Sequence, residues 1–86
     1  MGEIEQLRKK VDEIDEQIIN ALCERAKTCK AIGLIKKKQG KPVRDVSREN
    51  DVFKRVKEKA MQFDLNPTQV EAVYREIVNM CSAVQK

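Results

Sequence analysis

An apolar stripe running from Ile4 to Ile35 most constrains how this chain can fold. Its positions recur at alternating intervals of three and four residues, which is the spacing of one face of an α-helix. No proline interrupts the stripe, and Gly40 and Pro42 follow it as stop signals. The pattern predicts one helix over residues 3–38, roughly 54 Å long at a rise of 1.5 Å per residue. The stripe consists of Ile4, Leu7, Val11, Ile14, Ile18, Ala21, Arg25, Thr28, Ile32 and Ile35.

Two shorter helices are expected after the stop. The second begins near Asp45 to Ser47, either of which can cap it, and its stripe extends to Phe63. The third begins where Asn66 offers an N-cap and Pro67 suits the first helical position. These signals predict an all-α fold of three helices, and a length of 86 residues fits a single domain over residues 1–86.

The unequal helix lengths predict a homodimer. Each shorter helix is about 25–30 Å long, so a hairpin of the two covers about half of the long helix. The strip from Ile4 to Ile18 would then stay bare, which is more apolar surface than monomers usually expose. Two chains that cover each other's long helix, as an intertwined helical bundle, solve this problem.

Composition excludes several classes of function. A net charge of +4 is too small an excess to indicate a nucleic-acid partner. There is no histidine, and Cys23, Cys29 and Cys81 lack C-x-x-C spacing, which argues against a zinc site and against a disulfide framework. The start "MGEIEQLRKK" lacks the apolar core of a secretory signal, and no apolar run approaches the ~20 residues of a membrane span. We interpret the chain as a reduced, cytoplasmic protein with no membrane or metal partner.

Four polar residues occupy apolar stripes or their edges: Arg25, Lys36, Glu49 and Gln85. Lys36 follows Arg25 by eleven residues and so returns to within about 20° of the same face. Each residue alone fits an ordinary role, such as a snorkelling side chain or a helix end. Because burial of an unpaired charge is costly, the four together predict a polar cavity for a small anionic molecule.

Arg8 lies too far away to join this cavity within one chain. Seventeen residues, or about 25 Å of helix, separate it from Arg25. In an antiparallel dimer the partner's Arg8 could arrive instead. The alternative is an exposed ion pair between Arg8 and Asp12.

Segments along nearly the whole chain resemble the all-helical chorismate mutases, a family of intertwined three-helix dimers. They are "LRKKVDEIDEQIINAL", "ERAKTCKAIGLIK", "KPVRDVSREND" and a C-terminal pattern formed by Tyr74, Ile77, Cys81 and Gln85. The resemblance covers about residues 4–85, and "PVRDVSRE" after a long helix is its most specific part. It implies the conversion of chorismate to prephenate in phenylalanine and tyrosine biosynthesis, without a metal or cofactor.

The resemblance also implies roles for eight residues. Arg25 and the partner's Arg8 would bind the two substrate carboxylates, while Lys36 and Gln85 would donate to the ether oxygen. Glu49, with the backbone near Asp45, would accept from the ring hydroxyl. Arg48 would orient Glu49. Cys81 occupies a position where some members carry a carboxylate-binding serine, and a thiol is a weaker donor.

Three alternatives remain at the level of sequence. An isochorismate-pyruvate lyase uses a similar helical dimer and a similar dianion, although the full set of Asp45, Arg48 and Glu49 favours the mutase. A helical dimerisation module would not need Arg25 in its stripe. A basic nucleic-acid binder would place its cations on an exposed face.

Overall fold

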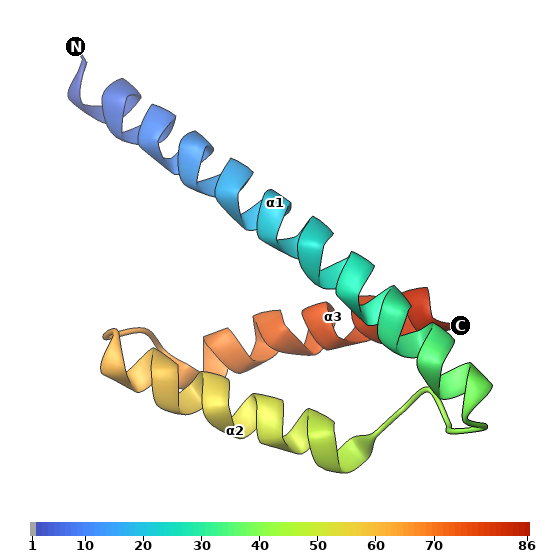
Figure 1. Cartoon of the computed structure of the whole chain (residues 1–86). Coiled ribbons are helices and arrows are strands. Elements are labelled where there is room, and N and C mark those ends of the chain that lie inside the picture. The colour runs from blue at the N-terminus through green and yellow to red at the C-terminus, as the bar shows by residue number, and fades with distance from the viewer. Residues whose placement is uncertain (1) are drawn as a thin grey trace.

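A computed structural model describes residues 2–86 as three helices. They are α1 (Glu3–Lys38), α2 (Val46–Gln62) and α3 (Pro67–Gln85) (Figure 1). The predicted all-α, three-helix chain is therefore confirmed, and α1 has the bounds expected from its apolar stripe. The chain is elongated, with extents of 58 × 24 × 15 Å, because α1 is much longer than the other two helices.

Side-chain caps define where the two shorter helices begin. Asp45 Oδ1 accepts a hydrogen bond from the backbone N–H of Arg48 at 3.0 Å, so α2 starts directly after the turn. Asn66 Oδ1 accepts from the backbone N–H groups of Thr68 and Gln69 at 3.0 and 3.1 Å. Each such cap contributes about 1 kcal/mol to helix stability. Both predicted caps are thus present.

Helix α3 lies between the other two helices (Figure 1). It pairs with α2 as a hairpin and packs its other side against the C-terminal half of α1. The buried core of this arrangement is small and lies mainly between α2 and α3. It comprises Val52, Phe53, Val56 and Val78, with Val70 and Tyr74 packed against them.

The crossing of α1 and α3 is unusually close at Gly33. A Cβ atom placed on Gly33 would lie 2.8 Å from the Cα of Gln85, so only glycine permits the two backbones to approach this far. One turn earlier, Cys29 of α1 and Cys81 of α3 are joined as a disulfide, with their Cα atoms 5.4 Å apart. The expectation that these cysteines stay unpaired was wrong. Their pairing depends on how α1 crosses α3, which the spacing of cysteines along the chain does not reveal.

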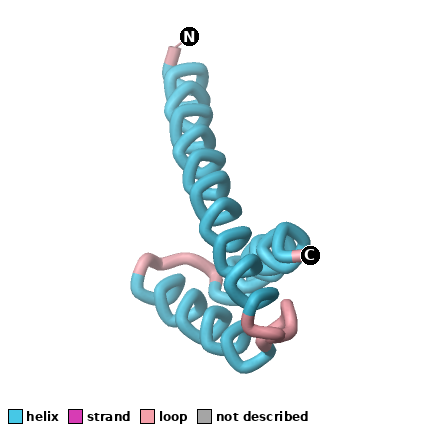
Figure 2. The backbone as a smooth tube through the Cα atoms, turned by 45° about the vertical axis from the view of Figure 1, so that its right-hand side comes forward, coloured by secondary structure: helices cyan, strands magenta, loops and turns pink. Residues whose placement is uncertain are grey.

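The N-terminal half of α1 projects away from the hairpin (Figures 1 and 2). Its apolar side chains are exposed to between 44% and 66%: Ile4, Leu7, Val11, Ile14 and Ile18. This is the strip that the helix lengths predicted to be bare. Within residues 2–86, none of the helices combines the length and apolar character needed to cross a membrane.

Candidate active site

A cavity of about 330 Å³ lies where the C-terminal half of α1, the start of α2 and the last turns of α3 meet. This volume falls within the range of pockets that bind small molecules. Seven of the eight residues assigned from the sequence line it: Arg25, Lys36, Asp45, Arg48, Glu49, Cys81 and Gln85. Side chains from all three helices therefore converge on one site.

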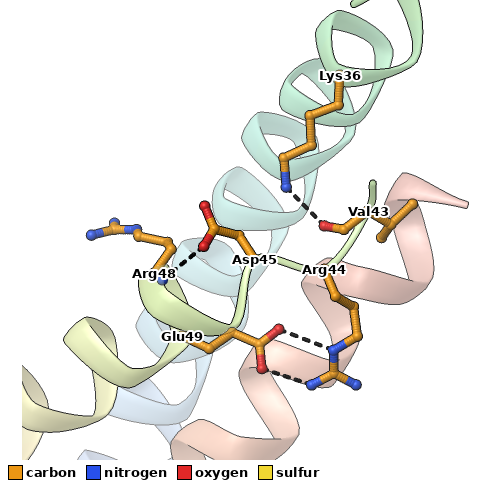
Figure 3. A network of polar contacts seen from close by, with 6 residues as sticks. All are labelled: Lys36, Val43, Arg44, Asp45, Arg48 and Glu49. Atoms are coloured by element: carbon orange, nitrogen blue, oxygen red, sulfur yellow. Dashed lines mark hydrogen bonds and ion pairs between the residues drawn. The ribbon is translucent and has the colours of Figure 1, made fainter. Parts of the chain in front are cut away.

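Lys36 connects the three parts of the chain that form the cavity. Its Nζ donates to the backbone carbonyl of Val43 at 2.8 Å, in the turn before α2 (Figure 3). The same Nζ donates to Gln85 Oε1 at 3.2 Å, in the last turn of α3. An ammonium group has three donors, so one N–H remains for a ligand. Lys36 is consequently a cation fixed in place rather than a mobile side chain at a helix end.

Gln85 has its carboxamide oriented by its two neighbours. Its Oε1 accepts from Lys36, and its Nε2 donates to Cys81 Sγ at 3.1 Å. With the carbonyl engaged by Lys36, the second N–H of the amide is the group left for a ligand. Lys36 and Gln85 thus present two N–H donors from one side of the cavity.

Arg25 enters the site from the middle of α1. It is half-buried, and its Nη1 contacts Cys29 Sγ at a distance of 3.7 Å. It also borders a second hollow of about 290 Å³, which lies along α2 and α3 and includes Arg55, Lys59 and Tyr74. A guanidinium has five donors, so most of them stay available for a carboxylate.

Glu49 is held by Arg44 and not by Arg48. Arg44 Nη2 lies 2.6 Å from Glu49 Oε1, and Arg44 Nε donates to Oε2 at 3.1 Å, which makes the pair bidentate. The hydrogen bond and the negative charge of Glu49 both raise the pKa of Arg44. The guanidinium of Arg48 extends away from Glu49 (Figure 3). The expected role of Arg48 in orienting Glu49 is therefore wrong, because Asp45 caps the helix and brings Arg44 beside its first turn.

Two further residues refine the site. Asp45 uses Oδ1 to cap α2, so its carboxylate is fixed by the backbone rather than aimed freely at a ligand. Ser82, the neighbour of Cys81, also lines the cavity, although it was not among the residues assigned from the sequence. Its hydroxyl can donate more strongly than a thiol. The cavity spans enough of α3 to include two successive residues, which a stripe pattern does not predict.

The charges that line the cavity favour an anionic ligand. Arg25, Lys36 and Arg48 supply three cations, against the carboxylates of Asp45 and Glu49. Arg44, outside the lining, already pairs with Glu49. The net balance is positive.

Arg8 is the one assigned residue that the single chain does not bring to the cavity. It lies on the exposed N-terminal half of α1, about 25 Å along the helix from Arg25. Any part it plays in this site requires a second chain.

Comparisons with known proteins agree with this architecture. A curated protein named bifunctional chorismate mutase/prephenate dehydratase, from Aquifex aeolicus, is 37% identical over 89 residues that include all of this chain. The chain spans 25% of that relative's length. A chorismate mutase from Methanocaldococcus jannaschii is 27% identical over 81 residues, which cover 94% of this chain and 82% of the relative.

A solved structure and a family match extend the comparison. A conserved hypothetical protein from Pyrococcus furiosus superposes with a TM-score of 0.76 at 32% identity, over 96% of this chain and 95% of that one. Residues 7–86 match the family described as chorismate mutase type II. Nearly the whole chain is included in that match, and the resemblance stated from the sequence is confirmed. The chain belongs to the chorismate mutase type II family.

Proposed function

We propose that this chain is a chorismate mutase, an isomerase that converts chorismate to prephenate. Its family and its relatives named chorismate mutase support this activity. The observation that carries the proposal is the Lys36–Gln85 pair, held at 3.2 Å on one side of a cavity that also contains Arg25. A fixed cation beside an oriented amide is the arrangement that a reaction with a developing negative charge requires.

The proposed reaction needs positioning more than chemical participation by the protein. In this rearrangement a C–O bond breaks while a C–C bond forms within one molecule, so no co-reactant takes part. The enzyme holds the flexible dianion in its compact reactive conformation. The free N–H groups of Lys36 and Gln85 donate to the ether oxygen, where negative charge develops as the C–O bond lengthens.

The remaining residues hold the substrate. Arg25 binds one carboxylate through its planar guanidinium, with Cys81 and Ser82 nearby on α3. Glu49 accepts a hydrogen bond from the ring hydroxyl, assisted by the backbone near Asp45. Arg44 keeps Glu49 in place, and Arg48 borders the cavity. Most of these groups are hydrogen-bonded before substrate arrives, so little reorganisation is needed on binding.

The proposal includes an intertwined homodimer in which each site receives Arg8 from the partner chain. The exposed strip on α1 supports it, since burial of such half-exposed side chains contributes roughly 1 kcal/mol each. Charge supports it as well. Residues 3–21 carry six acids and three bases, whereas the whole chain has a net charge of +4, so the rest is strongly basic. The acidic half of α1 thus complements the hollow containing Arg25, Arg55 and Lys59 on a second copy.

We also propose that residues 1–86 act as one domain in phenylalanine and tyrosine biosynthesis in the cytoplasm. The Aquifex relative supports the pathway, because its name joins a chorismate mutase to a prephenate dehydratase. The predicted location can be tested by cell fractionation with an antibody to the chain.

Incubation with chorismate tests the activity directly. We expect substrate loss with formation of prephenate, identified by chromatography after acid conversion to phenylpyruvate. Pyruvate release from isochorismate, with chorismate untouched, would instead identify a lyase. No reaction with either compound would contradict the proposal.

A further inference from the structure

The disulfide between Cys29 and Cys81 forms part of the wall of the cavity. Both cysteines line it, one from α1 and one from α3. Cys29 is only 5% exposed and Cys81 is half-buried. The separation of their Cα atoms, 5.4 Å, lies within the usual range for disulfides. The cross-link therefore ties together the two helices that carry Arg25, Lys36 and Gln85.

The disulfide is one helical turn away from the contact of Gly33 in α1 with Gln85 in α3. Cys29 precedes Gly33 by four residues, and Cys81 precedes Gln85 by four. Residues four apart lie above one another on the same helix face. The cross-link and the Gly33–Gln85 contact consequently act on the same short segment of α3.

Gln85 occupies the position in α3 that depends most on such support. It is the last residue of α3. Terminal turns of helices fray, because their final carbonyl groups have no partner within the helix. Gln85 is held by Lys36 and by Cys81 Sγ, and the disulfide fixes that sulfur to α1.

We propose that the Cys29–Cys81 disulfide positions Gln85 and makes the catalytic rate respond to the redox state of this pair. This inference rests on the proposed mutase function. A dithiol reductant attacks one sulfur, the S–S bond breaks, and a mixed disulfide forms. The reductant's second thiolate then releases the remaining cysteine sulfur. Two electrons and two protons pass to Cys29 and Cys81, and the reductant leaves as a disulfide.

Reduction mainly weakens the stabilisation of the transition state and has little effect on substrate binding. Once the cysteines are thiols, the last turn of α3 keeps its hydrogen bond to Lys36 and its contact with Gly33, but it is no longer covalently linked to α1. Gln85 donates to the ether oxygen as charge develops, so its misplacement lowers kcat. Arg25 binds a carboxylate already present in the substrate, and its contact with Cys29 Sγ is long, so KM changes little.

Hydrogen exchange tests the positioning without relying on turnover. Protein oxidised with a small-molecule disulfide is compared with protein reduced by dithiothreitol. We expect the amides of residues 82–86 to exchange about tenfold faster after reduction, while the amides of α2 that exchange through local opening are unchanged. Titration of the Cys23→Ser variant in denaturant should find no thiol after oxidation and two after reduction. Equal exchange in the two forms, or two thiols after oxidation, would overturn the proposal.

Kinetics test the link to Gln85. Reduction should lower the kcat of the wild-type protein about fivefold to tenfold and leave KM nearly constant. Cys23→Ser removes an exposed cysteine outside the cavity and should respond as the wild type does. In Gln85→Ala, reduction should have no further effect on kcat. An equal response in Gln85→Ala would overturn the assignment. Inactivity of every form towards chorismate would instead refute the proposed function, and hydrogen exchange would still decide the positioning.

Discussion

Lys36 and Gln85 are 49 residues apart in sequence, yet the Nζ of one donates to the Oε1 of the other at 3.2 Å. This contact closes the cavity between the last turn of α1 and the last turn of α3. Helix ends are the parts of a helix most prone to fray. Here the bond to Val43, the Gly33 contact and the disulfide hold both ends in place. The site is thus built from two helix termini that stabilise each other.

Replacement of Lys36 by alanine should abolish most of the activity. Loss of one preorganised donor to a developing negative charge costs roughly 10²-fold or more in kcat. The helical content should persist, because Lys36 is at the last turn of α1. Steady-state kinetics and circular dichroism measure both quantities. Lys37→Ala is the matched control, since Lys37 is the exposed neighbour in the same turn, and it should retain normal turnover. Near-normal turnover by Lys36→Ala would remove Lys36 from the mechanism.

Replacement of Arg44 by alanine should have a smaller effect, through Glu49. Arg44 is exposed and pairs with Glu49 from outside the cavity, and exposed ion pairs contribute little. We expect kcat/KM to fall by no more than about fivefold. Lys41→Ala removes a nearby exposed cation and should have no effect. A loss of several hundredfold in Arg44→Ala would mean that Arg44 itself touches the substrate.

The same pair predicts insensitivity to alkaline pH. The pKa of Arg44 is raised above its already high ordinary value by Glu49. A raised pKa means that the contribution of the pair is present below it and is lost only as pH rises through it. Arg44 should therefore cause no loss of activity between about pH 7 and 10. Over this range the pH profiles of the wild type and of Arg44→Ala should have the same shape.

Gly33→Ala tests the close crossing of α1 and α3. Alanine is favoured over glycine in a helix by about 1 kcal/mol, but its Cβ would meet the Gln85 backbone at 2.8 Å. Overpacking typically costs about 1–3 kcal/mol, so the net effect should be destabilising and should displace Gln85. Thermal unfolding and kcat should both decrease. Ala31→Ser, at an exposed site in α1, serves as the control. A stabilised and fully active Gly33→Ala would contradict the described crossing.

Reduction of the disulfide should lower thermal stability. The two cysteines are 52 residues apart. Removal of a disulfide that closes such a loop typically lowers the free energy of unfolding by about 2–4 kcal/mol, because the unfolded chain gains conformational freedom. For a domain of this size that corresponds to a fall in Tm of roughly 10–30 °C. The comparison requires equal protein concentration, because a dimer's Tm depends on it. An unchanged Tm would indicate that the cross-link contributes nothing to the folded state.

The sequence predicted what depends on local pattern. The stripe from Ile4 to Ile35 gave the length of α1, and Asn66 with Pro67 marked the start of α3. The occurrence of polar residues on apolar stripes was sufficient to predict four residues of the candidate site: Arg25, Lys36, Glu49 and Gln85. Each is anomalous in its own helix, so no tertiary information was needed.

What escaped prediction depends on how the helices cross or turn. The partnership of Arg44 with Glu49 arises at the start of α2, where Arg44 directly precedes the Asp45 cap and Glu49 lies in the first turn. The pairing of Cys29 with Cys81 requires the α1–α3 crossing. Neither leaves a periodic signal in the sequence.

Subunit complementation tests the shared site most directly. Each proposed site takes Arg25 from one chain and Arg8 from the other, so Arg8→Ala and Arg25→Ala homodimers should both be nearly inactive. After subunit exchange, a heterodimer has one site that lacks both arginines and one that retains both. Activity should return to about half of the wild-type value per heterodimer, or about a quarter overall for random assortment. If exchange is demonstrated by mass spectrometry and no activity returns, Arg8 is not donated across the dimer and the shared-site account is wrong.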